Sequence, residues 1–202
     1  MPPTRVRLVA IVLSIASASV GGADSAQRSA KNENVSATIS SRRMADGKEW
    51  TTTNLNVNAS PSYCYGDAET NCRRYGRLYT WASAQRACET LGNGWHLPTD
   101  AEWRQMAKRY GGVSDEAADK GRAAFKALSS GGTSGFSAVL GGNRFNGQYT
   151  RLEEHGLYWT ASDNDPSSAP FYNFGLGGQA LHRQPGSEGN KQMAISVRCI
   201  RE

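Results

Sequence analysis

Apolar residues recur at helical spacing in two segments of the chain. From Tyr79 to Leu91 they follow one another at intervals of three or four residues, which predicts a helix with one buried face. A second helix is expected after Thr99, because Thr99 and Glu102 have the spacing of a capping box and an apolar stripe follows. The two stripes are Trp81, Ala84, Cys88 and Leu91, and then Trp103, Met106, Ala107 and Tyr110.

The remaining segments are short and are separated by turn residues. A third and weaker helical pattern extends from Ser114 to Leu128 in spite of Gly121. Residues 56–76 contain many turn formers and are expected to form a loop. Together these patterns predict an α+β fold with two to three helices and a second half rich in strands and loops. Strands are expected at residues 49–55, 136–140, 157–162, 171–176 and 194–200, the last with Ile195, Val197 and Cys199 on one face.

The composition supports one compact domain with short additions. Of the 202 residues, 38% are hydrophobic and 20% are charged, which excludes a wholly disordered chain and a membrane-embedded bundle. Residues 1–23 combine two arginines, a 13-residue apolar run and small residues before Ala23, which is typical of a secretory signal peptide. The run is shorter than the roughly 20 residues of a membrane span. An uncleaved anchor is the alternative interpretation of this segment.

The signal peptide defines the expected domain organisation and destination. Residues 24–43 are polar and nearly free of large apolar side chains, so we interpret them as a flexible linker before a domain at residues 44–202. After cleavage no membrane span is expected. The protein is therefore expected to be secreted, periplasmic or attached to the cell surface.

The distribution of basic residues argues against nucleic-acid binding. Loss of the two signal-peptide arginines lowers the formal net charge from +5 to +3. The remaining lysines and arginines are scattered and form neither a block of five nor a stripe interleaved with aromatic residues. We therefore expect a solvated surface with a modest excess of positive charge.

Four cysteines follow the signal peptide, and an even number in an exported chain favours disulfide bonds. Three connectivities are possible, of which we favour Cys64–Cys72 within one loop and Cys88–Cys199 between the first helix and the last strand. The spacing does not match a zinc site, because no paired histidines accompany the cysteines. The fold is thus expected to be disulfide-stabilised.

Many short motifs follow one another in a definite order along the chain. They include Asp46 to Trp50, Cys64-Tyr65, Tyr75 to Trp81, Gly94 to Trp103, Leu140 to Arg144, Gly156 to Ser162 and Ile195 to Ile200. This order resembles the Fibrobacter succinogenes major paralogous (FISUMP) domain over residues 44–202. The resemblance implies a C-type lectin-like architecture and a secreted or bacterial cell-surface module, without an established activity. The chain departs from the family at Thr160-Ala161, where two serines are usual, and in a polar stretch after Ser162.

The residues that suggest catalysis have structural interpretations. His96 has no serine or cysteine nucleophile near it in the sequence, so we expect a hydrogen-bonded structural histidine. Asp100 and Glu102 fall in the first turn of a helix, where carboxylates cap free N–H groups. The scaffold is similar to that of formylglycine-generating enzymes, which need a late pair of copper-binding cysteines, but only Cys199 occurs late in this chain. We therefore expect no enzyme and no cofactor.

One loop offers oxygen ligands for a cation. Asp163, Asn164 and Asp165 precede a proline, and calcium prefers carboxylate and carbonyl oxygens. Residues of this kind before proline are also ordinary turn formers. Both interpretations, a calcium site and a plain turn, are open at this stage, and the short sugar-binding signatures of C-type lectins are absent.

The expected function is binding by the late loops. Aromatic, amide and guanidinium side chains of this kind bind sugars and proteins by stacking and adaptable hydrogen bonds. The leading hypothesis is a non-catalytic secreted or cell-surface binding module for a glycan or surface protein. The alternative is a structural or assembly module of the cell envelope without a small-molecule ligand. The expected ligand-binding residues are Asn143, Arg144, Tyr149, Tyr172, Asn173, His182 and Arg183.

Overall fold

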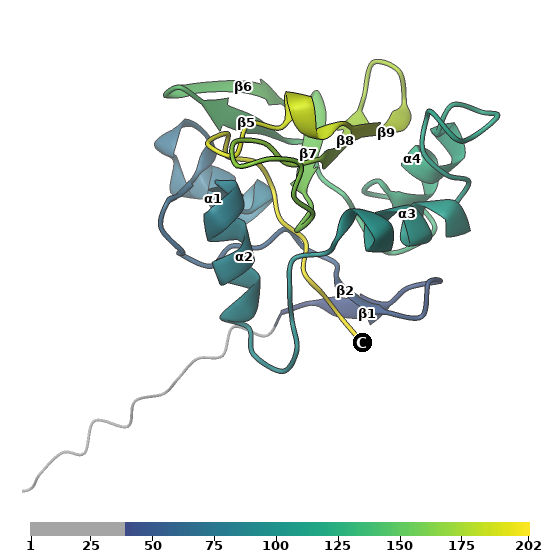
Figure 1. The fold of residues 1–202 in the computed structure, drawn as a ribbon, viewed down its shortest axis with the longest axis horizontal. Coiled ribbons are helices and arrows are strands. Elements are labelled where there is room, and N and C mark those ends of the chain that lie inside the picture. Colours follow the sequence, from purple (N-terminus) through teal and green to yellow (C-terminus); the bar gives the residue numbers. More distant parts are fainter. Residues whose placement is uncertain (1–38) are drawn as a thin grey trace, which may run out of the picture. The chain divides into compact units, whose positions relative to one another are not determined.

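A computed structural model describes residues 39–202, and its fold is α+β, as the sequence predicts (Figure 1). The expected signal peptide, residues 1–23, lies outside the described residues, as does most of the expected linker. The described part has four α-helices instead of two or three. The helices are α1 (Glu69–Tyr75), α2 (Trp81–Glu89), α3 (Asp100–Arg109) and α4 (Arg122–Leu128), with 3-10 turns η1 (Tyr65–Asp67) and η2 (Gly186–Glu188).

The strands of the described part form three sheets. Two of these are small: β1-β2-β10, made of Ser41–Arg43, Glu49–Thr51 and Ile200–Arg201, and β3-β4, made of Ser62–Tyr63 and Leu78–Tyr79. The β1 strand thus occupies the end of the segment expected to be a linker. In the largest sheet only the β5–β7 pair is parallel. Its order is β6 (Gln148–Leu152), β5 (Gly141–Phe145), β7 (His155–Trp159), β8 (Phe171–Gly175) and β9 (Ala180–Gln184).

The two helices with clear apolar stripes, α2 and α3, occur where the sequence predicts them. The cap of α3 is a reciprocal capping box: Thr99 Oγ1 accepts a hydrogen bond from the Glu102 N–H at 3.2 Å, and Glu102 Oε2 accepts one from the Thr99 N–H at 2.8 Å. Burial of Trp103 and Met106 follows the predicted stripe. Local periodicity and capping therefore determine this helix.

The predicted helix from Ser114 to Leu128 is wrong in its first half. Residues before Arg122 form turns, and α4 begins only after Gly121, whose φ of +77° is left-handed. A Cβ atom at Gly121 would lie 2.6 Å from the Leu181 carbonyl oxygen of β9. Because β9 approaches Gly121 so closely, α4 begins only after this residue, at a point that the local sequence pattern does not predict.

Several predicted strands and loops also need correction. The first strand stops at Thr51 instead of residue 55, residues 136–140 form only a single bridge, and residues 194–200 pair mostly through isolated bridges. The expected loop at residues 56–76 contains β3, η1 and α1. The strand predicted at residues 171–176 is confirmed as β8, whereas β5, β6 and β9 lie where no strand is predicted and where the ligand-binding loops are expected. Glycines in this half of the chain interrupt the alternation that would indicate a strand.

Two apolar clusters hold the elements together. One face of the large sheet packs against α3 and α4, and the Trp103 ring stacks on Tyr172 with ring centroids 4.9 Å apart. The second cluster joins α2 to the C-terminal segment and to the Trp159 end of the other sheet face. This second face is covered only in part, and it carries the polar residues described below.

The C-terminal segment runs from the large sheet to β2, which pairs with β1 on one side and with β10 on the other (Figure 1). Cys88 of α2 is bonded to Cys199 in this segment, and Cys64 is bonded to Cys72, as the sequence predicts. Structural disulfides persist in oxidising compartments, which indicates a destination outside the cytoplasm. None of the described helices is both long and apolar enough to cross a membrane.

Candidate binding site

Three of the expected ligand-binding residues share one face of the large sheet: Asn143, Asn173 and His182. Asn143 of β5 is paired with Thr150 of β6, and Asn173 of β8 is paired with His182 of β9. Residues directly opposite each other on neighbouring strands point to the same face. Asn143 Oδ1 accepts a hydrogen bond from Thr150 Oγ1 at 3.0 Å, and Asn173 Oδ1 accepts one from the Nδ1–H of His155 at 2.9 Å. Hydrogen bonding thus orients both amides on this face.

A hollow of about 380 Å³ opens beside Asn143, between the β5–β6 hairpin and the segment around η2. Phenyl rings and a thioether give it apolar surface, while amides, a hydroxyl and two charged side chains give it hydrogen-bonding groups. Ligand pockets in proteins combine apolar surface with a few oriented polar groups in this way. The hollow is lined by Asn143, Phe145, Gln148, Thr150, Arg151, Phe171, Glu188 and Met193.

Arg144 and Tyr149 lie on the opposite face of the same hairpin, as a directly paired couple. The Arg144 guanidinium carbon is 4.0 Å from the ring centroid of Tyr63 and 5.5 Å from that of Tyr149. Tyr149 Oη donates a hydrogen bond to Asp67 Oδ1 at 2.6 Å. Burial, together with this bond, raises the pKa of Tyr149. These two residues therefore form a second cluster, separate from the hollow.

Tyr172 and Arg183 bind a carboxylate of the protein itself. Arg183 Nε donates to both carboxylate oxygens of Asp100, at 2.8 and 3.0 Å, and Tyr172 Oη donates to one of them at 3.1 Å. Burial alone would raise the pKa of Asp100, but the bond and charge of Arg183 outweigh it and lower that pKa. These two residues join α3 to the sheet. They lie on strands β8 and β9 instead of on the late loops where ligand-binding residues are predicted.

The expected calcium ligands form a hydrogen-bonded turn. One carboxylate oxygen of Asp165 accepts bonds from the N–H and the hydroxyl of Ser167, both at 2.8 Å. The hydrogen bonds from Ser168 and Ser167 lower the pKa of Asp165. Asp163 forms an ion pair with the Lys191 ammonium, while Asn164 donates to Asp165. A cation at this turn would have to displace Lys191 and the serine hydroxyls.

The residues that suggested catalysis take part in the cap of α3. Asp100 and Glu102 are the acidic residues of its first turn. His96 lies within hydrogen-bonding distance of this cap, with Nε2 3.3 Å from Glu102 Oε1. Burial opposes ionisation of Glu102, but the hydrogen bonds from Thr99, Lys48 and His96 outweigh it and lower the pKa of that carboxyl group. The cap interpretation therefore holds for Glu102, whereas the carboxylate of Asp100 binds Arg183 and Tyr172.

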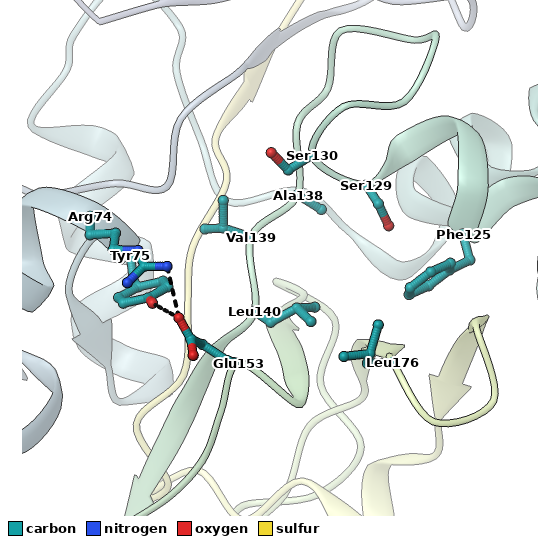
Figure 2. A pocket seen from close by; sticks show the side chains of 10 residues that line it. All are labelled: Arg74, Tyr75, Phe125, Ser129, Ser130, Ala138, Val139, Leu140, Glu153 and Leu176. Atoms are coloured by element: carbon teal, nitrogen blue, oxygen red, sulfur yellow. Dashed lines mark hydrogen bonds and ion pairs between the residues drawn. The ribbon is translucent and has the colours of Figure 1, made fainter.

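A larger pocket, of about 480 Å³, was not predicted from the sequence (Figure 2). At one end Glu153 Oε1 accepts hydrogen bonds from Tyr75 Oη at 2.6 Å and from Arg74 at 2.8 Å. Burial and this bond raise the pKa of Tyr75 to about 12. The other end is apolar, with Phe125 opposite Leu176, which is 48% exposed. Its lining comes from segments far apart in the chain, so no local motif indicates it.

Comparison with known proteins places the chain in a family. Residues 31–201 match the family model described as the Fibrobacter succinogenes major domain. Searches of the curated proteins and of the solved structures returned no match. The matched region includes both disulfides, the large sheet and both polar clusters on its hairpin. The chain therefore belongs to the Fibrobacter succinogenes major domain family.

Proposed function

We propose that the domain is a non-catalytic binding module that holds a glycan in the hollow beside the β5–β6 hairpin. The observation that carries this proposal is the side-chain chemistry of the hollow. Gln148 and Thr150 offer hydrogen-bonding groups to sugar hydroxyls, while the half-buried Phe145 offers aromatic surface to the apolar face of a sugar ring. A rigid strand pair supports these groups, which limits the entropy that is lost on binding.

The destination and the fold type belong to the same proposal. We place the protein in the periplasm, at the cell surface or in the medium, because two disulfides join its elements. We also propose a C-type lectin-like architecture. Three features support it: the sheet in which β1 and β10 both pair with β2, the bridge from α2 to the last segment, and a second half rich in strands.

A glycan array with the full chain, followed by calorimetry on the best hit, tests this function. Replacement of Gln148 by alanine is expected to weaken binding about tenfold, which corresponds to one lost hydrogen bond of roughly 1.4 kcal/mol. Gln148 is exposed, so the fold should survive its replacement. Gln105→Ala, an equally exposed change on α3, is the matched control and should bind normally. An array without hits, combined with specific capture of one envelope protein, would favour an assembly role instead.

A further inference from the structure

Arg144 differs from the other buried or half-buried arginines of the described part, because its Nε has no hydrogen-bond partner there and no carboxylate pairs with its guanidinium. It is half-buried, its Nε is enclosed, and that nitrogen has no hydrogen-bond partner within residues 39–202. No carboxylate of the described residues lies within ion-pairing distance of it. Every other buried or half-buried arginine of the described part has at least one oxygen atom as an acceptor, either a carboxylate or a carbonyl. These arginines are Arg77, Arg104, Arg183, Arg198 and Arg201.

The surrounding structure holds Arg144 in place. Its backbone N–H and carbonyl both bond to Ala194, at 2.9 and 2.8 Å, and β6 pairs on its other side. The guanidinium lies over the Tyr63 ring, and a disulfide at the next residue, Cys64, anchors that tyrosine. Tyr149 flanks it, and the Tyr65 ring lies 5.2 Å from the Tyr149 ring. The positive charge is therefore oriented before any ligand arrives.

A partly desolvated charge without a partner is unfavourable, and an anionic ligand removes that disadvantage. A guanidinium matches the planar geometry of a carboxylate and binds it through two parallel hydrogen bonds. The adjacent tyrosine rings supply flat amphipathic surface of the kind that contacts sugar rings. Asp67 is the carboxylate nearest to this cluster in the hydrogen-bond network, and it accepts the hydroxyl of Tyr149 without pairing with Arg144.

We propose that Arg144, between Tyr63 and Tyr149, binds the carboxylate of an acidic sugar residue, so that the ligand of this domain is a uronate-containing glycan. This inference rests on the proposed function in taking the ligand to be a glycan, and it adds the charge of that glycan. The hollow on the opposite face of the hairpin contributes further hydrogen-bonding groups, and its two charged side chains, Arg151 and Glu188, are of opposite sign, whereas Arg144 selects for acid. Arg144 is thus a specificity-determining binding residue.

Calorimetry of the full chain with tetragalacturonate and with its fully methyl-esterified form tests the inference. The two ligands share one sugar backbone and differ in charge. The acid is expected to bind at least tenfold more tightly, and this preference should shrink as sodium chloride is added. Arg144→Gln should reduce the affinity for the acid to that for the ester. Arg144→Lys should restore only part of it, because lysine keeps the charge but not the paired hydrogen bonds.

Two controls separate this contact from general effects. Arg109→Gln removes an exposed arginine of α3 and should leave the preference for acid unchanged. The variant Arg144→Gln loses the contacts of the guanidinium with the Tyr63 and Tyr149 rings but no ion pair, so its melting temperature should fall only slightly. If this variant nevertheless unfolds, the comparison of acid with ester in the unchanged protein still decides the question.

Equal affinity for acid and ester, with binding still sensitive to Gln148→Ala, would overturn this inference and leave the proposed function standing. Absence of binding for both ligands, together with an empty glycan array, would remove both proposals. Tetraglutamate that binds as tightly as tetragalacturonate would show a general anion site and would likewise overturn the assignment to an acidic sugar.

Discussion

Arg198 is the largest charged side chain that is fully buried in the described part. Its guanidinium bonds to Asn54 Oδ1 and to the carbonyl oxygens of Thr51, Phe136 and Ser137, each at 2.7 Å. It also lies 4.5 Å from the ring centroid of Phe136. Burial lowers the pKa of Arg198, but no carboxylate compensates its charge. This one residue therefore satisfies backbone carbonyls of two separate segments and the side chain of Asn54.

Replacement of Arg198 by methionine is expected to lower the free energy of unfolding by about 3 kcal/mol or more, because buried carbonyls would lose their donors. Arg109→Met, at an exposed position, should change it by less than about 0.5 kcal/mol. Urea denaturation of both variants measures the difference. Similar stabilities would show that Arg198 contributes little to the core.

The pair of Asp100 and Arg183 predicts a pH dependence of stability. The pKa of Asp100 is lowered in the folded protein, so its ionisation stabilises the fold above the unfolded value of about 3.9. This contribution is lost as the pH falls through the folded value. The stability difference between the unchanged protein and Asp100→Asn should therefore be larger at pH 7 than at pH 3. Denaturation at both values measures it, and a constant difference would contradict the argument.

At the scale of elements, the start of α4 is decided by a contact with another element. Gly121 has a left-handed φ, and a Cβ there would meet the backbone of Leu181 and Ser114. Gly92 has a φ of +65° but open space around its Cβ position. Two glycines with similar local conformations thus differ in their tertiary surroundings. This difference cannot be predicted from the sequence alone.

Gly121→Ala is expected to destabilise the fold by about 2–4 kcal/mol, because backbone strain adds to the clash with β9. Gly92→Ala carries only the strain and should lose about 1 kcal/mol. Thermal melts followed by circular dichroism compare the two. Equal losses would mean that α4 and β9 can move apart at little cost.

The turn at residues 163–168 leads to a prediction about calcium. The carboxylates of Asp163 and Asp165 already bind the Lys191 ammonium and neighbouring serine hydroxyls, so a calcium ion would have to compete with these groups. Millimolar calcium chloride should leave the melting temperature unchanged relative to a chelator. A rise in melting temperature, together with heat in calorimetry, would support the calcium interpretation instead.

At the scale of the molecule, the two bridges close loops of very different length. Cys88–Cys199 spans 111 residues and Cys64–Cys72 spans eight. In the chain-entropy treatment the long loop contributes about 4–5 kcal/mol and the short loop about 2–3 kcal/mol. The long bridge also joins α2 to the segment that delivers Arg198 and β10 to the core. It therefore matters more for the whole fold.

The double variant Cys88→Ser with Cys199→Ser is expected to melt at a lower temperature than the double variant Cys64→Ser with Cys72→Ser. Both variants remove one bridge and leave no free thiol, so they are matched controls for each other. Differential scanning calorimetry in the absence of reductant compares them. The reverse order would show that native contacts near the short bridge outweigh loop entropy.

The sequence by itself determined the features that depend on neighbouring residues: the stripes of α2 and α3 and the capping box at Thr99. It also favoured disulfide bonds among four cysteines, with three connectivities possible. The stripes and the cap span only a few residues, so a local pattern is enough to predict them. Only the tertiary structure decided which side chains share a surface. In the folded protein Asn143 and Arg144 lie on opposite faces of one hairpin, and Arg183 binds Asp100.

The physical reason lies in strand pairing. A strand turns successive side chains to opposite faces, and its neighbours come from distant parts of the chain, so the partner of each residue depends on register. Glycines in the second half interrupt the alternation of apolar and polar residues, so the strands there are not evident from the sequence. The missing acceptor of Arg144 and the pocket of Figure 2 are therefore properties of the folded arrangement, which no local pattern contains.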